Sequence, residues 1–169
     1  MENILNKVDK VLGYFLMTLM ALMVVDVTWQ VVTRFILSTP SSFTEELARF
    51  FLVWIGLLGA AYAYRTGAHL GLDLLTANMQ PVPRRRTAIV SNLVCFIFAA
   101  LVMVYGGLSL VSLMLELGQT SSALQVKIGY VYSVIPLSGF LICIYALDNI
   151  RRPGSHLPTE TQGESAQYE

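Results

Sequence analysis

Four long apolar segments constrain what this chain can fold into. Each has about 20 or more mostly apolar residues, the length that a helix needs to cross the hydrocarbon core of a bilayer. Of the 169 residues, 55% are hydrophobic and only 13% are charged, about half the usual charged share of a soluble domain. We predict an all-α integral membrane protein with four transmembrane helices, at residues 11–37, 43–64, 88–115 and 130–150.

The lysines and arginines are concentrated on one side of these predicted spans. They precede the first span, lie between the second and third, and follow the fourth, whereas the opposite side has few. Cytoplasmic loops of membrane proteins carry an excess of Lys and Arg, so we predict that both chain ends face the cytoplasm. The residues that we assign to the cytoplasmic interface are Arg65, His69, Arg84, Arg85 and Arg86.

Two segments outside the spans differ in character. Residues 68–80 are too short and too polar to cross a bilayer, but their apolar positions share one helical face. They predict a short helix lying in the cytoplasmic interface, with an irregular loop as the alternative. Residues 153–169 consist largely of Gly, Ser, Thr, Glu, Gln and Pro, which predicts a disordered cytoplasmic tail after a membrane domain of residues 1–152.

Ionisable residues within the first two spans are informative because a charge is costly inside a bilayer. Residues 26, 30 and 34 form a polar stripe on one face of the first span. Across the short connection to the second span, we expect Arg34 to contact Glu45 or Glu46. Acids and bases are nearly balanced, which favours a structural cluster; a transport site with a titrating carboxylate is the alternative. The cluster comprises Asp26, Gln30, Arg34, Glu45, Glu46 and Arg49.

Small residues recur along the second span. At this density they permit close approach of another helix. That helix belongs either to another membrane subunit or to the four-helix unit itself, and the sequence leaves both interpretations open. The candidates for a subunit interface are Trp29, Trp54, Gly56, Gly59, Ala60 and Ala63.

Several classes of function lack support in the sequence. It contains no phosphate-binding loop, no nucleophile paired with a base and no cluster of metal ligands, so we expect neither an enzyme nor a cofactor held by this chain. The 11 basic and 11 acidic residues balance, which gives no basic surface for nucleic acid. The two histidines lie outside the spans, so a buried haem would lack axial ligands.

Two ordered elements resemble the small membrane subunit, DctQ type, of the tripartite ATP-independent periplasmic (TRAP) transporters. The first is WQVVTRF at residues 29–35, and the second is TEELAR at residues 44–49. The resemblance covers roughly residues 3–152, and its specific part ends at His69. It also includes Trp54, Gly59, Ala63 and Arg65.

This resemblance implies a supporting role in a bacterial inner membrane. The small subunit would pair with a large DctM-type membrane subunit, which holds the substrate and sodium sites. A periplasmic binding protein would deliver an organic acid to the pair. Sodium is therefore expected in the partner rather than in this chain, and the lipid bilayer surrounds both.

The residues alone also permit other functions. A self-contained small multidrug-type exporter would use Asp26 as its proton-coupled carboxylate. Against it stand Arg34 and the paired acids at the start of the second span. A third possibility is a structural or assembly membrane protein that is unrelated to transport.

Overall fold

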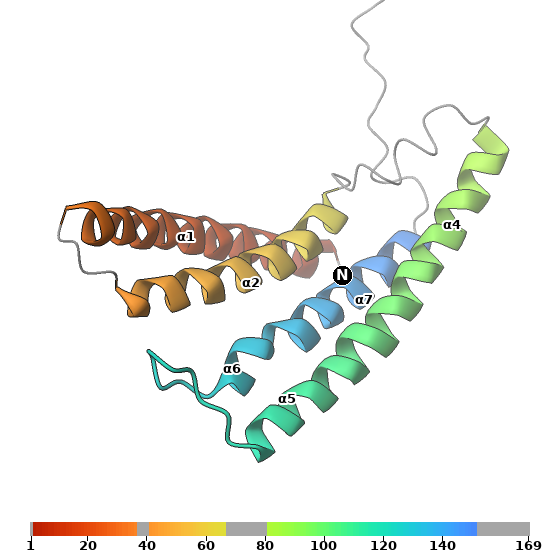
Figure 1. Ribbon diagram of the computed structural model, residues 1–169. Coiled ribbons are helices and arrows are strands. Elements are labelled where there is room, and N and C mark those ends of the chain that lie inside the picture. Colours follow the sequence, from red (N-terminus) through yellow and green to blue (C-terminus); the bar gives the residue numbers. More distant parts are fainter. Residues whose placement is uncertain (1, 37–40, 67–80, 152–169) are drawn as a thin grey trace, which may run out of the picture.

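The computed structural model describes residues 2–36, 41–66 and 81–151 of the chain (Figure 1). These residues are almost wholly helical and contain no strand. Four of their helical stretches are long and apolar enough to span a membrane: Leu5–Phe35, Ser42–Arg65, Ile89–Glu116 and Ile128–Ile150. The prediction of an all-α integral membrane protein with four spans is confirmed. The predicted interfacial helix, at residues 68–80, and the predicted tail, at 153–169, lie outside the described residues.

The helices form antiparallel neighbours in a single row (Figure 1). α1 packs against α2, α2 packs against α7, and α7 packs against one long composite helix. We call the end where α1 begins and α7 finishes the terminal end, and the opposite end the loop end. The elements are α1 (Glu2–Phe35), α2 (Ser42–Arg65), α6 (Ile128–Tyr132) and α7 (Val134–Arg151), with the composite helix built from α4 (Pro81–Phe98), the π-helical η1 (Ala99–Gly106) and α5 (Gly107–Glu116).

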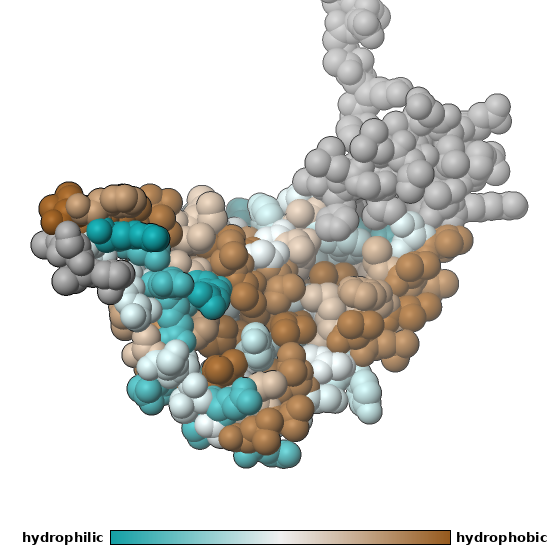
Figure 2. Space-filling view, viewed as in Figure 1, coloured by the Kyte–Doolittle hydropathy of each residue, from teal (hydrophilic) through white to brown (hydrophobic). Residues whose placement is uncertain are grey.

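The surface follows the membrane character of the sequence. Figure 2 shows hydrophobic residues over much of the composite helix and α7, while hydrophilic residues gather towards the loop end. Large apolar side chains such as Tyr105, Leu108 and Leu101 are more than half exposed, as expected for positions that face lipid. The buried core is correspondingly small and lies between α1, α2 and α7.

The fourth span is interrupted near its start. α6 ends at Tyr132, and α7 begins at Val134, two residues before Pro136. Pro136 has no N–H to bond the carbonyl of Tyr132, and the carbonyls in the last turn of α6 have no partner within that helix. One of them, the carbonyl of Val131, accepts a hydrogen bond of 3.1 Å from Nε1 of Trp54 on α2. The predicted membrane helix therefore contains a break whose free carbonyl holds a neighbouring helix in place.

Glycines bring the third and fourth spans close together. A Cβ added to Gly139 would lie 2.5 Å from Cβ of Met103 in η1. A Cβ added to Gly129 would lie 2.7 Å from Cγ of Leu115. A side chain at Gly139 would push η1 away from α7, because the nearest atoms are the Cβ and backbone of Met103, whereas at Gly129 the Leu115 side chain would have to move.

Candidate functional site

The six residues predicted as one charge cluster are not brought together. Glu45 and Arg49 form the expected i,i+4 ion pair of 3.1 Å, but both side chains are more than 60% exposed. An ion pair with this exposure contributes little to stability in water. None of the ion pairs among the described residues includes Arg34, whose side chain is exposed. The expected contact of Arg34 with Glu45 or Glu46 is therefore not found.

Glu46 instead holds the loop between α5 and α6. Its Oε2 accepts hydrogen bonds from the backbone N–H of Ala123, at 2.8 Å, and of Leu124, at 3.0 Å. The loop is compact, with N–H of Ser121 bonded to the carbonyl of Val126 and Gln125 in a positive-φ conformation. A carboxylate that accepts two backbone amides makes strong, charge-assisted bonds. These two bonds give Glu46 its partners in the loop between α5 and α6 rather than on α1.

Replacing Glu46 by alanine should loosen this loop without unfolding the bundle. The amides of Ala123 and Leu124 would lose their acceptor, so their hydrogen exchange should quicken several-fold while exchange within α7 stays unchanged. Hydrogen–deuterium exchange with mass spectrometry measures both regions in one experiment. Glu45→Ala is the matched control, because Glu45 pairs with Arg49 on its own helix and its side chain is exposed. Equal exchange in the two variants would contradict the assigned role.

Asp26 is the buried member of the predicted stripe. It is 8% exposed, and its Oδ2 has no hydrogen-bond partner among the described residues. Gln30, one turn further, is half-buried, and Thr33 is 5% exposed. The inward face of α1 thus runs through Asp26, Gln30 and Thr33 rather than continuing to Arg34.

The main polar cluster lies at the terminal end, and the sequence alone did not reveal it. Arg65, only 6% exposed, closes α2. Its Nε lies 3.1 Å from Oδ2 of Asp9 on α1, and its Nη1 lies 3.0 Å from Oδ2 of Asp148 on α7. The Tyr145 hydroxyl donates to Oδ1 of Asp9 at 2.7 Å, and the Arg65 guanidinium lies 5.7 Å from the centre of the Tyr145 ring. We call Asp9, Arg65, Tyr145 and Asp148 the Arg65 network.

The Arg65 network joins α1, α2 and α7, and a neighbouring hydrogen bond joins α2 to α4. The buried Tyr64 hydroxyl donates to Oδ1 of Asn92 on α4. Every span therefore has a polar contact at the terminal end, where Leu5 and Ala146 form a buried cluster with Tyr64 and Tyr145. This arrangement fixes the relative positions of the helices at one depth.

The residues predicted for the cytoplasmic interface have different outcomes. Arg65 lies at the end of α2, where it is buried in ion pairs with Asp9 and Asp148. The backbone of Arg84, Arg85 and Arg86 belongs to the first turns of α4, and nothing is described of their side chains. His69 lies outside the described residues.

The candidates for a subunit interface separate into two groups. A Cβ added to Gly56 or to Gly59 would meet no atom of the described chain within 4 Å, so these glycines make no close helix contact here. Trp54 is used within the chain, since it bonds to α6 and packs edge-to-face on Phe15 of α1 with 6.3 Å between ring centres. Trp29 is 54% exposed on α1, and Ala60 and Ala63 are half-buried.

The described residues contain no group of three or more His, Cys, Asp or Glu side chains that could hold a metal ion. Their polar groups serve mainly to join helices and to fix one loop. The outward-facing surface includes apolar side chains of α1 and of the composite helix, and the side of α2 that carries Gly56 and Gly59.

Comparison with known proteins identifies relatives of most of the membrane region. The model of the DctQ component of the tripartite ATP-independent periplasmic transporters matches residues 23–154. The isethionate TRAP transporter permease protein DctMQ of Oleidesulfovibrio alaskensis is 28% identical over 80% of this chain and 22% of its own length. The C4-dicarboxylate TRAP transporter small permease protein DctQ of Rhodobacter capsulatus is 33% identical over 59% of this chain and 43% of its own length.

A third relative matches along most of both chains. A putative TRAP transporter small permease protein of Haemophilus influenzae is 26% identical over 86% of this chain and 88% of its own length. The chain spans less than half the length of the first two relatives. The family match covers well over half of the chain, including three complete spans. The chain is therefore a multi-pass membrane protein that belongs to the DctQ family, the small permease subunits of the TRAP transporters.

Proposed function

We propose that this chain is the static scaffold of a sodium-coupled importer of an organic acid in a bacterial inner membrane. It would pair with a large DctM-type membrane subunit, which carries the substrate and sodium, and a periplasmic binding protein would deliver the substrate. This chain would contribute the fixed membrane frame against which the large subunit is held.

The observation that carries this proposal is the open side of α2. Gly56 and Gly59 have space beside them, whereas Gly129 and Gly139 are already closed against neighbouring side chains. Small residues in membrane helices permit close approach of a second helix. Since the four-helix unit packs closely against Gly107, Gly129 and Gly139 but not against Gly56 and Gly59, α2 is the side on which we place the large subunit.

The names of the relatives support the substrate class and the partner. They include an isethionate transporter and a C4-dicarboxylate transporter, both of which move organic anions. The name DctMQ joins two components in one permease, and this chain matches only 22% of it. The remainder of that relative fits the expectation of a much larger membrane partner.

The fixed geometry of the chain also suits a scaffold. A sodium-coupled elevator normally has inverted repeats and broken helices whose ends meet at the membrane midplane. Here the break near Pro136 is filled by Trp54, and the charged Arg65 network ties helices at their ends. The family match does not favour the alternative of a self-contained exporter that uses Asp26.

Adding bulk to the open side of α2 should separate the two membrane subunits. In cells that express this chain with its large partner, Gly56→Leu should lower co-purification of the partner roughly tenfold, because a side chain would enter a close helix contact. The yield of the chain itself should stay unchanged, since nothing described lies within 4 Å of the added Cβ.

Ser109→Leu is the control for added bulk on an exposed membrane position, because the Ser109 hydroxyl donates to the carbonyl of Tyr105 on its own composite helix. Undiminished co-purification of the partner with Gly56→Leu would remove α2 as the interface.

Transport is tested by reconstitution: the chain alone should move no organic acid and no drug, and the complex should move the acid only with a sodium gradient. Proton-coupled efflux by the chain alone, lost in Asp26→Asn, would support the exporter instead.

A further inference from the structure

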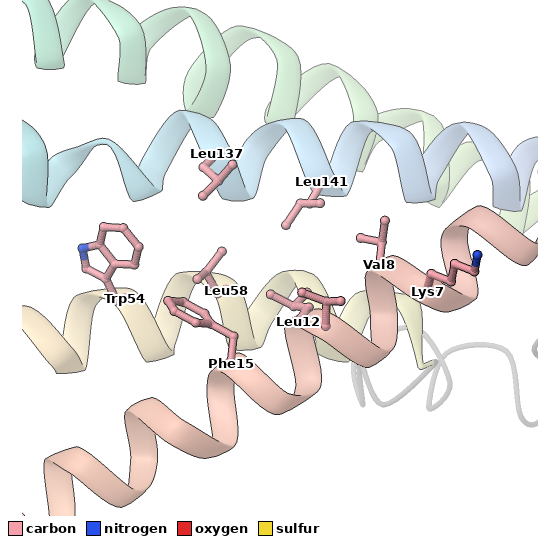
Figure 3. A pocket seen from close by; sticks show the side chains of 9 residues that line it. Lys7, Val8, Leu12, Phe15, Trp54, Leu58, Leu137 and Leu141 are labelled. Atoms are coloured by element: carbon pink, nitrogen blue, oxygen red, sulfur yellow. The ribbon is translucent and has the colours of Figure 1, made fainter.

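An apolar groove opens between α1, α2 and α7 at the terminal half of the bundle. Its volume is about 440 Å³, within the ~300–1,000 Å³ range of small-molecule sites. Figure 3 shows side chains of the three helices converging on it, with Leu12 and Leu58 at its buried side. The groove is lined by Lys7, Val8, Val11, Leu12, Phe15, Trp54, Leu58, Leu137 and Leu141.

The lining has one charged group, and that group lies at one end. Lys7 is exposed and stands at the opposite end of the groove from Trp54 (Figure 3). The indole N–H of Trp54 is already bonded to the Val131 carbonyl, so only its ring is offered to an occupant. None of the ion pairs among the described residues uses Lys7, and the neighbouring Asp9 contacts Arg65 and Tyr145. The occupant should therefore be apolar along most of its length and anionic at the Lys7 end.

The length of the groove matches one leaflet of a bilayer. From Lys7 to Phe15 the rise along α1 is about 12 Å at ~1.5 Å per residue. Half of a hydrocarbon core of ~30 Å is about 15 Å. Lys7, near the start of the Leu5–Phe35 span, stands where a lipid headgroup would be. Lysines at such positions extend towards anionic headgroups.

We propose that this groove binds one acyl chain of an acidic phospholipid, with the lipid phosphate on the Lys7 ammonium. The acyl chain would lie over Leu12 and Leu58 and end at the ring of Trp54. On the predicted orientation of the chain, the lipid belongs to the cytoplasmic leaflet, where anionic lipids are enriched. This lipid site requires only that the chain lies in a membrane, so its test is independent of the proposed transporter role.

The test is native mass spectrometry of the full chain, released from vesicles of phosphatidylglycerol and phosphatidylcholine. The unmodified chain should retain one phospholipid and select phosphatidylglycerol. Leu137→Trp on α7 and Val11→Trp on α1 change two residues that line the groove, and each should abolish retention by filling it. Lys7→Glu should lower the phosphatidylglycerol share about fivefold or more, because a headgroup contact is replaced by repulsion.

Two controls match these variants. Leu113→Trp changes a leucine with the same 48% exposure as Leu137 but on α5, away from the groove. Lys10→Glu reverses a nearby exposed charge that does not line it. The proposal is overturned if the control variants lose lipid as the groove variants do, or if neither groove-filling variant changes retention. It is also overturned if the chain retains no lipid once its large partner is bound, since the groove would then receive partner side chains.

Discussion

Replacing Arg65 by alanine is expected to destabilise the folded chain by about 3–5 kcal/mol, the range for removing one partner of a buried ion pair. The Arg65 side chain is 7% exposed, and those of Asp9 and Asp148 are 19% and 13% exposed. Without the guanidinium, two carboxylates would remain at a largely buried helix junction without the cation that both now contact. The bonds that join α2 to α1 and to α7 at this end would be lost together.

The measurement is the free energy of unfolding in mixed micelles with increasing SDS, followed by circular dichroism. Arg49→Ala is the control, because it also removes an arginine from α2 and breaks an ion pair of 3.1 Å, but one between exposed side chains. It should change the unfolding free energy little. The triple variant Asp9→Asn, Arg65→Met, Asp148→Asn should recover much of the loss, since it leaves no buried charge.

A loss in Arg65→Ala no larger than that in Arg49→Ala would show that the Arg65 network does not stabilise the bundle. A triple variant as unstable as Arg65→Ala would show that the lost contacts, rather than the stranded carboxylates, cause the effect. The comparison therefore separates pairing of charge from packing of the long arginine side chain.

The spans were predictable because their signal is local. Twenty apolar residues in succession identify a membrane helix wherever it packs, and all four were recognised in this way. The Arg65 network was not recognised, although antiparallel spans place Asp9, Arg65 and Asp148 at the same end. The positive-inside rule treats Arg65 as a loop charge. Used in that way, it gives no reason to pair Arg65 with the two acids at the same end of the neighbouring helices.

The predicted charge cluster is the opposite kind of error, because it includes a contact that the structure does not contain. Glu46 lies close to Arg34 in sequence, so a contact across the short connection was expected. The structure joins Glu46 to backbone amides that follow it by 77 and 78 residues. Backbone donors of a loop carry no residue-type signature, so no pattern of charges could reveal them. The glycines pose the same problem, because free and close-packed glycines look alike in a sequence.

Gly139→Ala is expected to destabilise the chain by about 1–3 kcal/mol, although it adds a single methyl group. The new Cβ would lie 2.5 Å from Cβ of Met103 and 3.2 Å from the Met103 carbonyl carbon. Neither atom is the end of a flexible side chain, so α7 and η1 must move apart. The loss should appear as a lower SDS midpoint of unfolding, with faster hydrogen exchange in both helices.

Gly56→Ala is the matched control on α2. Its Cβ would meet no described atom within 4 Å, and alanine favours a helix over glycine by roughly 0.5–1 kcal/mol. The isolated chain should therefore be as stable as before or slightly more stable, whereas Gly139→Ala should be less stable with or without a partner. If both alanines proved harmless, the third and fourth spans would not be in close contact at Gly139. If both destabilised the isolated chain equally, the space beside Gly56 would already be occupied by this chain, and the docking side proposed on α2 would be lost.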